Sequence, residues 1–265
     1  MESQDSCNFL IISKISEISG HHFTIQDNPG TLTLMNPIQQ LSLVLTLTTG
    51  ASGALVFPDS GLASPLAIPD HDASGILRAV TVTGLDTGTA YAVSVALDVQ
   101  GTGYGGFVGD LYAYLAHQAP DGSYTMTVLL NRPGRSDLML SGYDDAGLNI
   151  VLSDDAAHDI HTYQSQSYQL GTGGALTGSW QPDRRLADPD TVTDASARAA
   201  TTLSSIVNGD PNGTWYCFIA DMETGATMQL TSWSVSFAVP EASTTLTLGA
   251  LAASALLVRR RRGAA

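Results

Sequence analysis

Acidic side chains in short loops are the first candidates for chemistry in this chain. Asp70, Asp72 and Ser74 alternate before Gly75, which matches the first half of an EF-hand loop. An EF-hand needs a glutamate at the twelfth loop position, where Thr81 stands, so this motif is excluded. Carboxylates from several loops could still bind Ca²⁺ together, and the candidate ligands are Asp70, Asp72, Asp110, Asp144 and Asp145. The alternative is that these aspartates cap turns by accepting hydrogen bonds from their own backbone.

A second polar group lies further along the chain. His158 and His161 are spaced like two metal ligands, and aspartates at 154, 155 and 159 stand beside them. A zinc site would need a third nitrogen or sulfur ligand, which this segment lacks. A solvated loop is therefore the preferred interpretation.

Cysteine chemistry is not expected. Cys7 and Cys217 are the only cysteines, and Cys7 falls in a predicted leader, so no internal disulfide framework is expected. Cys217 alternates with Trp215 and Ile219 along one face of a predicted strand. This pattern predicts a buried, inert thiol.

Aromatic side chains could bind a carbohydrate. The candidates are Tyr104, Phe107, Tyr112, Tyr114, Tyr163 and Trp180. Several of them should point into the core, because side chains alternate between the two faces of a strand. A carbohydrate-binding, lectin-like jelly roll is therefore an alternative function.

The elements that must position these side chains are predicted to be β-strands. Period-two alternation with β-branched residues marks seven segments, at 79–83, 90–99, 111–117, 124–130, 148–152, 214–220 and 228–237. Residues 154–194 have little regular pattern and are expected to form long loops, and 198–206 are expected to form a short helix. Many short strands between turn signals predict an all-β protein, a jelly-roll β-sandwich.

The charge of the chain limits its partners. Its 265 residues carry a formal net charge of −14. The region from Pro58 to Val239 contains six arginines, no lysine and twenty acidic residues. Such a surface repels nucleic acid and anionic lipid, so we expect no nucleic-acid partner. It is compatible with divalent cations.

The C-terminal 27 residues, 239–265, form a three-part tail. Val239, Pro240 and Glu241 precede an apolar run from Thr244 to Val258, and four arginines follow, Arg259, Arg260, Arg261 and Arg262. The run is fifteen residues long, about 22 Å as a helix, which is short of the roughly 20 residues of a full span. The arginines would stay in the cytoplasm and leave the preceding residues exported. A tail-anchor helix is the alternative to a sorting tail.

The N-terminal residues are predicted to direct export. An apolar run from Leu41 to Leu47, followed by small residues, predicts a signal peptide over 35–54 that signal peptidase cleaves near Ala51 to Ala54. Residues 1–34 are interpreted as a gene-model extension or a long n-region. The two hydrophobic segments thus flank one exported domain, 55–238.

The tail and the domain each resemble a known sequence family. The tail resembles the PEP-CTERM signal, which implies recognition by an exosortase and transient or permanent membrane anchoring. Ala242 replaces the second proline of that signal. Residues 64–237 resemble the P/Homo B domain of subtilisin-like proprotein convertases. The residues that carry this resemblance are Ile68-Pro69-Asp70, Gly109-Asp110-Leu111, Asn212-Gly213-Thr214-Trp215 and Ser232-Trp233-Ser234-Val235-Ser236-Phe237.

The family resemblance implies a jelly roll without catalytic residues of its own. P/Homo B domains accompany serine-type endopeptidases, and bacterial relatives often bind Ca²⁺ in their loops. No His-Gly-Thr or Gly-Thr-Ser-Met-Ala element of such a protease occurs in this sequence, so we expect no enzyme activity. The expected function is a non-catalytic binding or stabilising module at the cell envelope, outer surface or extracellular matrix. The alternative is an accessory role in proteolysis, and the expected partners are a protease or an extracellular polysaccharide.

Overall fold

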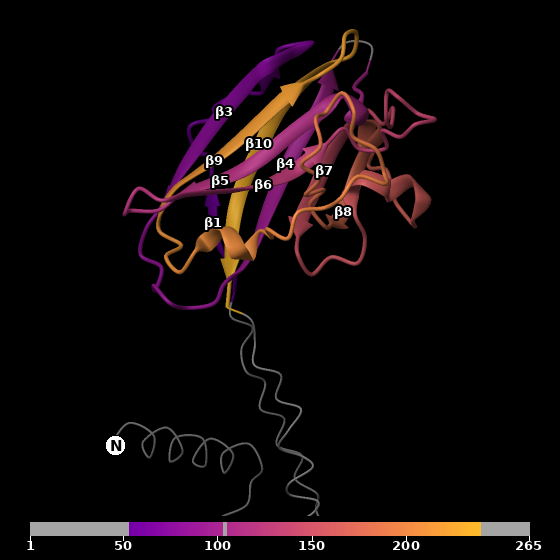
Figure 1. Cartoon of the computed structure of the whole chain (residues 1–265). Helices are drawn as coiled ribbons and strands as arrows, with labels where there is room; N and C mark the ends of the chain where they lie inside the picture. The colour runs from indigo at the N-terminus through magenta and orange to yellow at the C-terminus, as the bar shows by residue number, and fades with distance from the viewer. Residues whose placement is uncertain (1–52, 103–104, 240–265) are drawn as a thin grey trace, which may run out of the picture. The chain divides into compact units, whose positions relative to one another are not determined.

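The protein is a sandwich of two β-sheets (Figure 1). The computed structural model describes residues 53–102 and 105–239. The four-stranded sheet has the order β3 (Asp72–Val82), β9 (Gly213–Asp221), β5 (Leu111–Gln118), β6 (Tyr124–Asn131). The six-stranded sheet has the order β1 (Leu55–Pro58), β10 (Thr227–Ala238), β4 (Ala92–Thr102), β7 (Gly147–Ser153), β8 (Ala175–Trp180), and β2 (Leu66–Ile68) also pairs with β10. The prediction of an all-β sandwich is confirmed.

Alternating side chains of both sheets form the core. Val93, Val95, Leu97 and Val99 of β4 are at most 2% exposed, and buried residues alternate in the same way along β9 up to Ile219 and along β10 on each side of its bulge. Apolar burial of this kind is the main stabilising contribution to folding. The period-two pattern in the sequence therefore reports directly on which face of each strand points inward.

Aromatic rings join the two sheets at the centre of the core. Trp215 of β9 packs edge-on against Phe237 of β10, with 5.2 Å between ring centroids. On its other side Trp215 stacks on His117 of β5 at 4.3 Å. Because the contact between Trp215 and Phe237 fixes β9 in the core, it also positions the ends of β9 and the loops attached to them.

Asp59 links the sheets through polar contacts. Its carboxylate accepts hydrogen bonds from Arg78 Nε of β3 at 2.7 Å and from Trp233 Nε1 of β10 at 3.0 Å. The Asp59 side chain is only 3% exposed. The hydrogen bond from Arg78 lowers the pKa of this carboxyl, because it stabilises the ionised form.

The seven predicted strands are all present, and three further strands were missed. β1 and β2 are only four and three residues long, too short for a period to show. β8 lies in the segment predicted as loop and pairs in parallel with β7. Its residues Thr177, Gly178 and Ser179 are not buried and have no apolar alternation.

The predicted helix over 198–206 is wrong. The structure has a 3-10 helix, η4, only at Ser204–Val207. Residues before it are held extended, since Ala199 N donates to Arg184 O at 2.7 Å and Arg198 forms a bridge with Arg185. These long-range backbone contacts override the local helical pattern. The other 3-10 helices are η1 (Val108–Asp110), η2 (Ile160–Ser165) and η3 (Thr172–Gly174).

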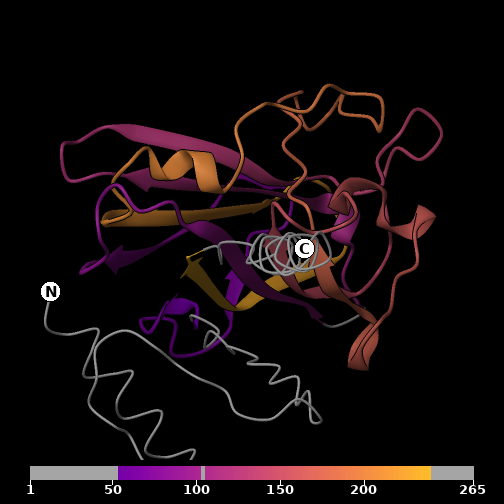
Figure 2. The ribbon, with the colours of Figure 1, turned by 90° about the horizontal axis from the view of Figure 1, so that it is seen from below.

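The long connections gather on one side of the sandwich, next to β7 and β8 (Figure 1), and Figure 2 shows them from below. In the portion of the chain that the structure describes, no helix has the length and apolarity needed to cross a membrane. The predicted signal peptide lies almost wholly outside the described residues, and so does the sorting tail beyond Val239.

Candidate functional site

An acidic cluster lies at one end of the four-stranded sheet. Asp221 is the last residue of β9, and its Cα pairs with those of Leu111 and Asp72 on the neighbouring strands. Asp110 ends η1 and directly precedes Leu111. The sheet register therefore brings together the predicted residues Asp72 and Asp110 with Asp221, which the sequence analysis missed.

Asp221 has an unsatisfied carboxylate oxygen. The residue is 0% exposed, and its Oδ1 atom accepts a hydrogen bond from Glu223 N at 3.2 Å. Its Oδ2 atom is buried without a hydrogen-bond partner among the described residues. Because a buried polar atom without a partner is costly, this oxygen is a natural position for a cation or a water molecule.

Asp110 lies in the same buried environment. It is 4% exposed, and burial raises its pKa to about 7, with the charge of Asp221 as a further cause. Burial also raises the pKa of Asp221, to about 6, and the charge of Asp70 adds to this. Both carboxyls are destabilised as anions, which is the condition in which a nearby cation has the largest effect.

Arg132 supplies positive charge to this cluster. Its side chain is 1% exposed and donates from Nε to Gly109 O at 3.0 Å and from Nη1 to Glu223 Oε1 at 2.9 Å. Its Nη2 atom lies 3.9 Å from Asp110 Oδ1. The charges of Asp221, Glu223 and Asp70 all act on Asp110, so Arg132 leaves an excess of negative charge.

The remaining predicted ligands of the first loop accept hydrogen bonds from backbone N–H groups. Asp70 accepts a hydrogen bond from Gly225 N at 3.1 Å, and Asp72 accepts one from Ser74 N at 2.9 Å. This hydrogen bond lowers the pKa of Asp72. The turn-capping alternative thus describes Asp72 well, whereas Asp70 also contributes charge to the buried pair.

Asp144 and Asp145 have other environments. The Asp145 carboxylate accepts hydrogen bonds from the Tyr163 hydroxyl and from Gln164 Nε2. Asp144 is exposed. The structure therefore directs the Asp145 side chain to the η2 segment and not to Asp110 and Asp221.

The donor types at this end of the sheet fit Ca²⁺. Carboxylate oxygens and backbone carbonyls are the ligands this ion prefers, and the two buried carboxylates of Asp110 and Asp221 are the side chains that could hold it. Within residues 53–102 and 105–239, no group of three or more His, Cys, Asp or Glu side chains is arranged to hold a metal ion. Carbonyl oxygens and water would have to complete the coordination.

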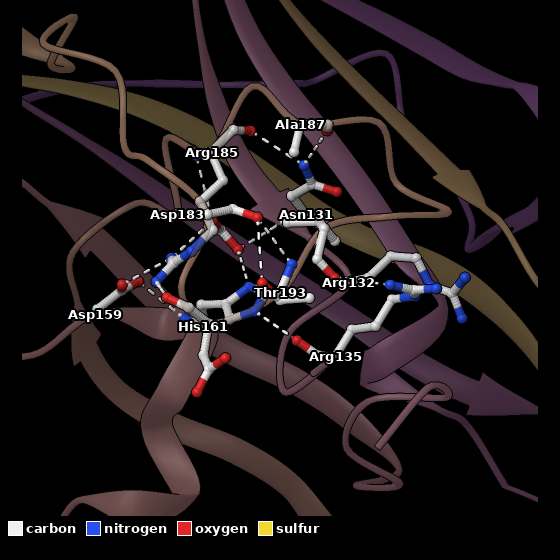
Figure 3. Close-up of polar contacts among 12 residues, drawn as sticks. Asn131, Arg132, Arg135, Asp159, His161, Asp183, Arg185, Ala187 and Thr193 are labelled. Atoms are coloured by element: carbon white, nitrogen blue, oxygen red, sulfur yellow. Dashed lines mark hydrogen bonds and ion pairs between the residues drawn. The ribbon is translucent and has the colours of Figure 1, made fainter. Parts of the chain in front are cut away.

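A second polar cluster surrounds His161 and Asp183 (Figure 3). His161 Nδ1 lies 2.7 Å from Asp183 Oδ2, and Arg185 Nη1 donates to Asp183 Oδ1 at 3.0 Å and to Asp159 Oδ2 at 2.8 Å. Asp183 also accepts from Asn131 N at 3.2 Å. Residues 154–199, which contain η2, η3 and β8, form the long 154–199 connection. These contacts fasten it to the end of β6.

His161 is therefore a structural residue. It is 0% exposed, and its Nε2 atom lies 3.0 Å from Arg135 O, so both ring nitrogens have partners. The interpretation of this segment as a solvated loop is wrong for His161, because the ion-paired network buries it. His158 remains exposed, and the two histidines form no joint site.

Other reactive side chains are also engaged in the core. His117 contacts Asn212 O at 2.8 Å and Ile206 O at 3.2 Å through its two ring nitrogens. Cys217 is 1% exposed, as predicted, and burial raises the pKa of its thiol to about 12. Such a thiol is a poor nucleophile at neutral pH.

The predicted aromatic set is divided by the fold. Tyr163 and Trp180 are at most 4% exposed, so they cannot line an open carbohydrate site. Tyr112 and Tyr114 lie on the outer face of β5. Phe107 is partly buried, and Tyr104 lies outside the described residues.

Comparisons with known proteins do not identify a family. No protein-family model matches the chain, and no curated protein matches it. Among solved structures, the crystal structure of the Aeromonas sobria serine protease (ASP) and chaperone (ORF2) complex is similar at 15% identity with a TM-score of 0.33. The match covers 72% of this chain and 27% of that chain. A likeness this weak carries no argument about function, and the P/Homo B assignment stays a prediction.

Proposed function

We propose that this chain is an exported, non-catalytic β-sandwich module of the P/Homo B type that binds Ca²⁺ at its acidic end. The observation that carries the proposal is the buried pair Asp110 and Asp221, because one carboxylate oxygen of Asp221 has no hydrogen-bond partner in the part of the chain that the structure describes. Burial of two carboxylates is unfavourable unless positive charge compensates them, and a divalent cation supplies more of it than Arg132 does alone.

The absence of catalysis in this proposal is supported by the environments of the reactive side chains. His117 and His161 each use both ring nitrogens in contacts within the protein. The Cys217 thiol is buried and has a raised pKa. None of these three groups is positioned to activate or attack a substrate.

The module's location and partner follow from the sequence resemblances. The signal peptide at 35–54 would export the domain, and an exosortase would sort it through the tail at 239–265 to the cell envelope or extracellular matrix. A separately encoded serine-type endopeptidase is the partner that the P/Homo B resemblance implies. Co-purification of a protease activity with the domain tests that partner.

Thermal unfolding of the full chain tests the cation site. The protein is first treated with EDTA and then titrated with Ca²⁺, with Mg²⁺ in parallel. Ca²⁺ at about one hundred times its Kd should raise Tm by about 5–10 °C, because a ligand that binds only the native state stabilises it. Mg²⁺ should have a smaller effect, since it demands stricter octahedral geometry. An unchanged Tm at saturating Ca²⁺ would refute the proposed cation site.

A further inference from the structure

The outer face of the four-stranded sheet carries a group of large uncharged side chains. Cys217 and Leu115 point into the core, so their neighbours along β9 and β5 point outward. The largest outward side chains, which we call the aromatic face, are Leu77, Tyr112, Tyr114, Tyr124, Tyr216 and Phe218.

The register arranges this face in rows across the strands. Leu77 of β3 is opposite Phe218 of β9, which is opposite Tyr114 of β5. Two positions further along, Ala79 is opposite Tyr216. Since neighbouring strands lie about 4.8 Å apart, a row over four strands extends about 14 Å. This length matches an extended ligand better than a single small molecule.

Three of the aromatic rings are fixed by contacts with one another. Tyr114 and Phe218 stack with centroids 4.8 Å apart and an angle of 14° between the rings. Tyr112 packs at 6.4 Å from both rings. Little side-chain entropy is therefore lost when a ligand binds to this preordered surface.

Part of this face is open to solvent. Leu77 is 55% exposed and Tyr124 is 54% exposed. The Tyr216 hydroxyl contacts Gln118 Oε1 at 3.1 Å, so donors and acceptors border the apolar rings. Apolar patches that alternate with hydroxyl groups would complement this surface.

The face is uncharged on a strongly acidic domain. Three rows cross the sheet from Leu77, Ala79 and Thr81 of β3. Their residues are only Leu, Ala, Thr, Tyr, Phe, Val, Met and Gln. The whole chain has a net charge of −14, which disfavours the binding of anionic polymers. A neutral polymer meets no such repulsion and loses no ionic hydration on binding.

From these observations we infer that the aromatic face binds a neutral polysaccharide. The apolar ring faces of the sugars contact Tyr216, Tyr124 and the stacked Tyr114–Phe218 pair, and the sugar hydroxyls exchange hydrogen bonds with the tyrosine hydroxyls and Gln118. This ligand rests on the proposed function, which assigns the exported protein to the extracellular matrix. The binding test below needs no Ca²⁺, so its failure is independent of the cation site.

Native affinity electrophoresis of the full chain provides the test. The gels contain hydroxyethyl cellulose, galactomannan or alginate, and the first two are neutral. Migration should be retarded by a neutral polymer and not by the anionic alginate. Tyr124→Ala and Tyr216→Ala should weaken binding roughly three- to tenfold each, as expected for loss of one ring contact. Ala79→Glu, which adds a charge to an exposed position without removing a ring, should also weaken it.

Tyr168→Ala serves as the matched control, because Tyr168 is 37% exposed and lies in the long 154–199 connection. It should bind as the unaltered protein does, and melting curves confirm that each variant is folded. Free migration in all three polymers would overturn the inference, and so would equal retardation of the face variants. Preferential retardation by alginate would do the same. A dimer in size-exclusion chromatography that Ala79→Glu dissociates would assign the face to a second copy instead.

Discussion

Aspartates of this chain differ sharply according to what surrounds them. Asp59 faces Arg78 and the indole N–H of Trp233, and these donors lower its pKa. Asp110 and Asp221 are buried beside each other, and burial raises the pKa of both. The first carboxylate stabilises the fold as an anion, whereas the other two favour a bound proton or cation.

Neutralising the buried pair should separate its two effects. Asp110→Asn and Asp221→Asn are expected to abolish the rise of Tm with Ca²⁺, because each removes one charged ligand. In EDTA the same variants should melt no lower than the unaltered protein, since the repulsion between the two carboxylates is relieved.

Asp121→Asn is the control for this pair. Asp121 caps the turn between β5 and β6, at the opposite end of the sheet, by accepting from Ser123 N at 2.8 Å. An asparagine preserves that cap, so the Ca²⁺ response should persist. A full Ca²⁺ response in Asp110→Asn and Asp221→Asn would contradict the assignment.

Asp59 should contribute to acid sensitivity. Its pKa is lower in the folded than in the unfolded protein, so its stabilisation is present above about pH 4 and is lost as pH falls through the folded pKa. Asp59→Asn should cost about 2–3 kcal/mol at pH 7 and should flatten the loss of stability below about pH 4. Urea unfolding between pH 7 and pH 3 measures both effects. Asp137→Asn, at an exposed position, should change neither; an equal pH profile for Asp59→Asn would contradict the prediction.

The start of β9 is tightly constrained by the segments around it. Asn212 accepts from Leu85 N at 3.0 Å and donates to Leu85 O at 2.8 Å, which holds the turn before the strand. Gly213 has a φ of +121°, and a Cβ there would lie 2.2 Å from Gln118 O. Only glycine fits, because a side chain would be strained and would also collide with the β5 backbone.

Gly213→Ala should therefore be strongly destabilising. We expect a loss of at least about 2 kcal/mol, since the strain and the collision add together. Gly84→Ala is the matched control: φ is +82° there, but nothing lies within 4 Å of the added Cβ. That variant should lose only about 1 kcal/mol, from backbone strain alone. Equal losses in urea unfolding would show that the collision with Gln118 O has no cost.

The domain as a whole is built so that its two ends meet. Leu55 of β1 pairs with Phe237 of β10, so the first and last strands lie side by side (Figure 1). β1 starts at Leu55 and β10 ends at Ala238. Cleavage outside these limits would leave every strand that the structure describes intact, which makes the domain compatible with processing at both ends.

Intact mass spectrometry of the protein recovered from cells tests that processing. The mature chain is expected to start near residue 54 and to end near Val239. Retention of Arg259 to Arg262 in the mature protein would contradict cleavage of the tail, and a mass that includes residues 1–34 would contradict the predicted signal peptide.

What the sequence determined by itself is the class of fold and the inward face of each long strand. Alternation has a period of two residues and is a local property, so Val93 to Val99 and Trp215 to Ile219 could be read directly. β1 and β2 were missed because they are too short for a period to show, and β8 was missed because its central residues, Thr177 to Ser179, have no apolar alternation. Asp110 was recognisable as a candidate from its place before a strand.

Only the tertiary structure decided which acidic residues act together. Asp221 stands 111 positions after Asp110, and the antiparallel register of β5 and β9 brings them to the same end of the sheet. The same register assembles the aromatic face from four strands, and the long connection buries His161 against Asp183. Burial and proximity between distant segments set the charge and reactivity of these groups, and no local pattern in the chain encodes them.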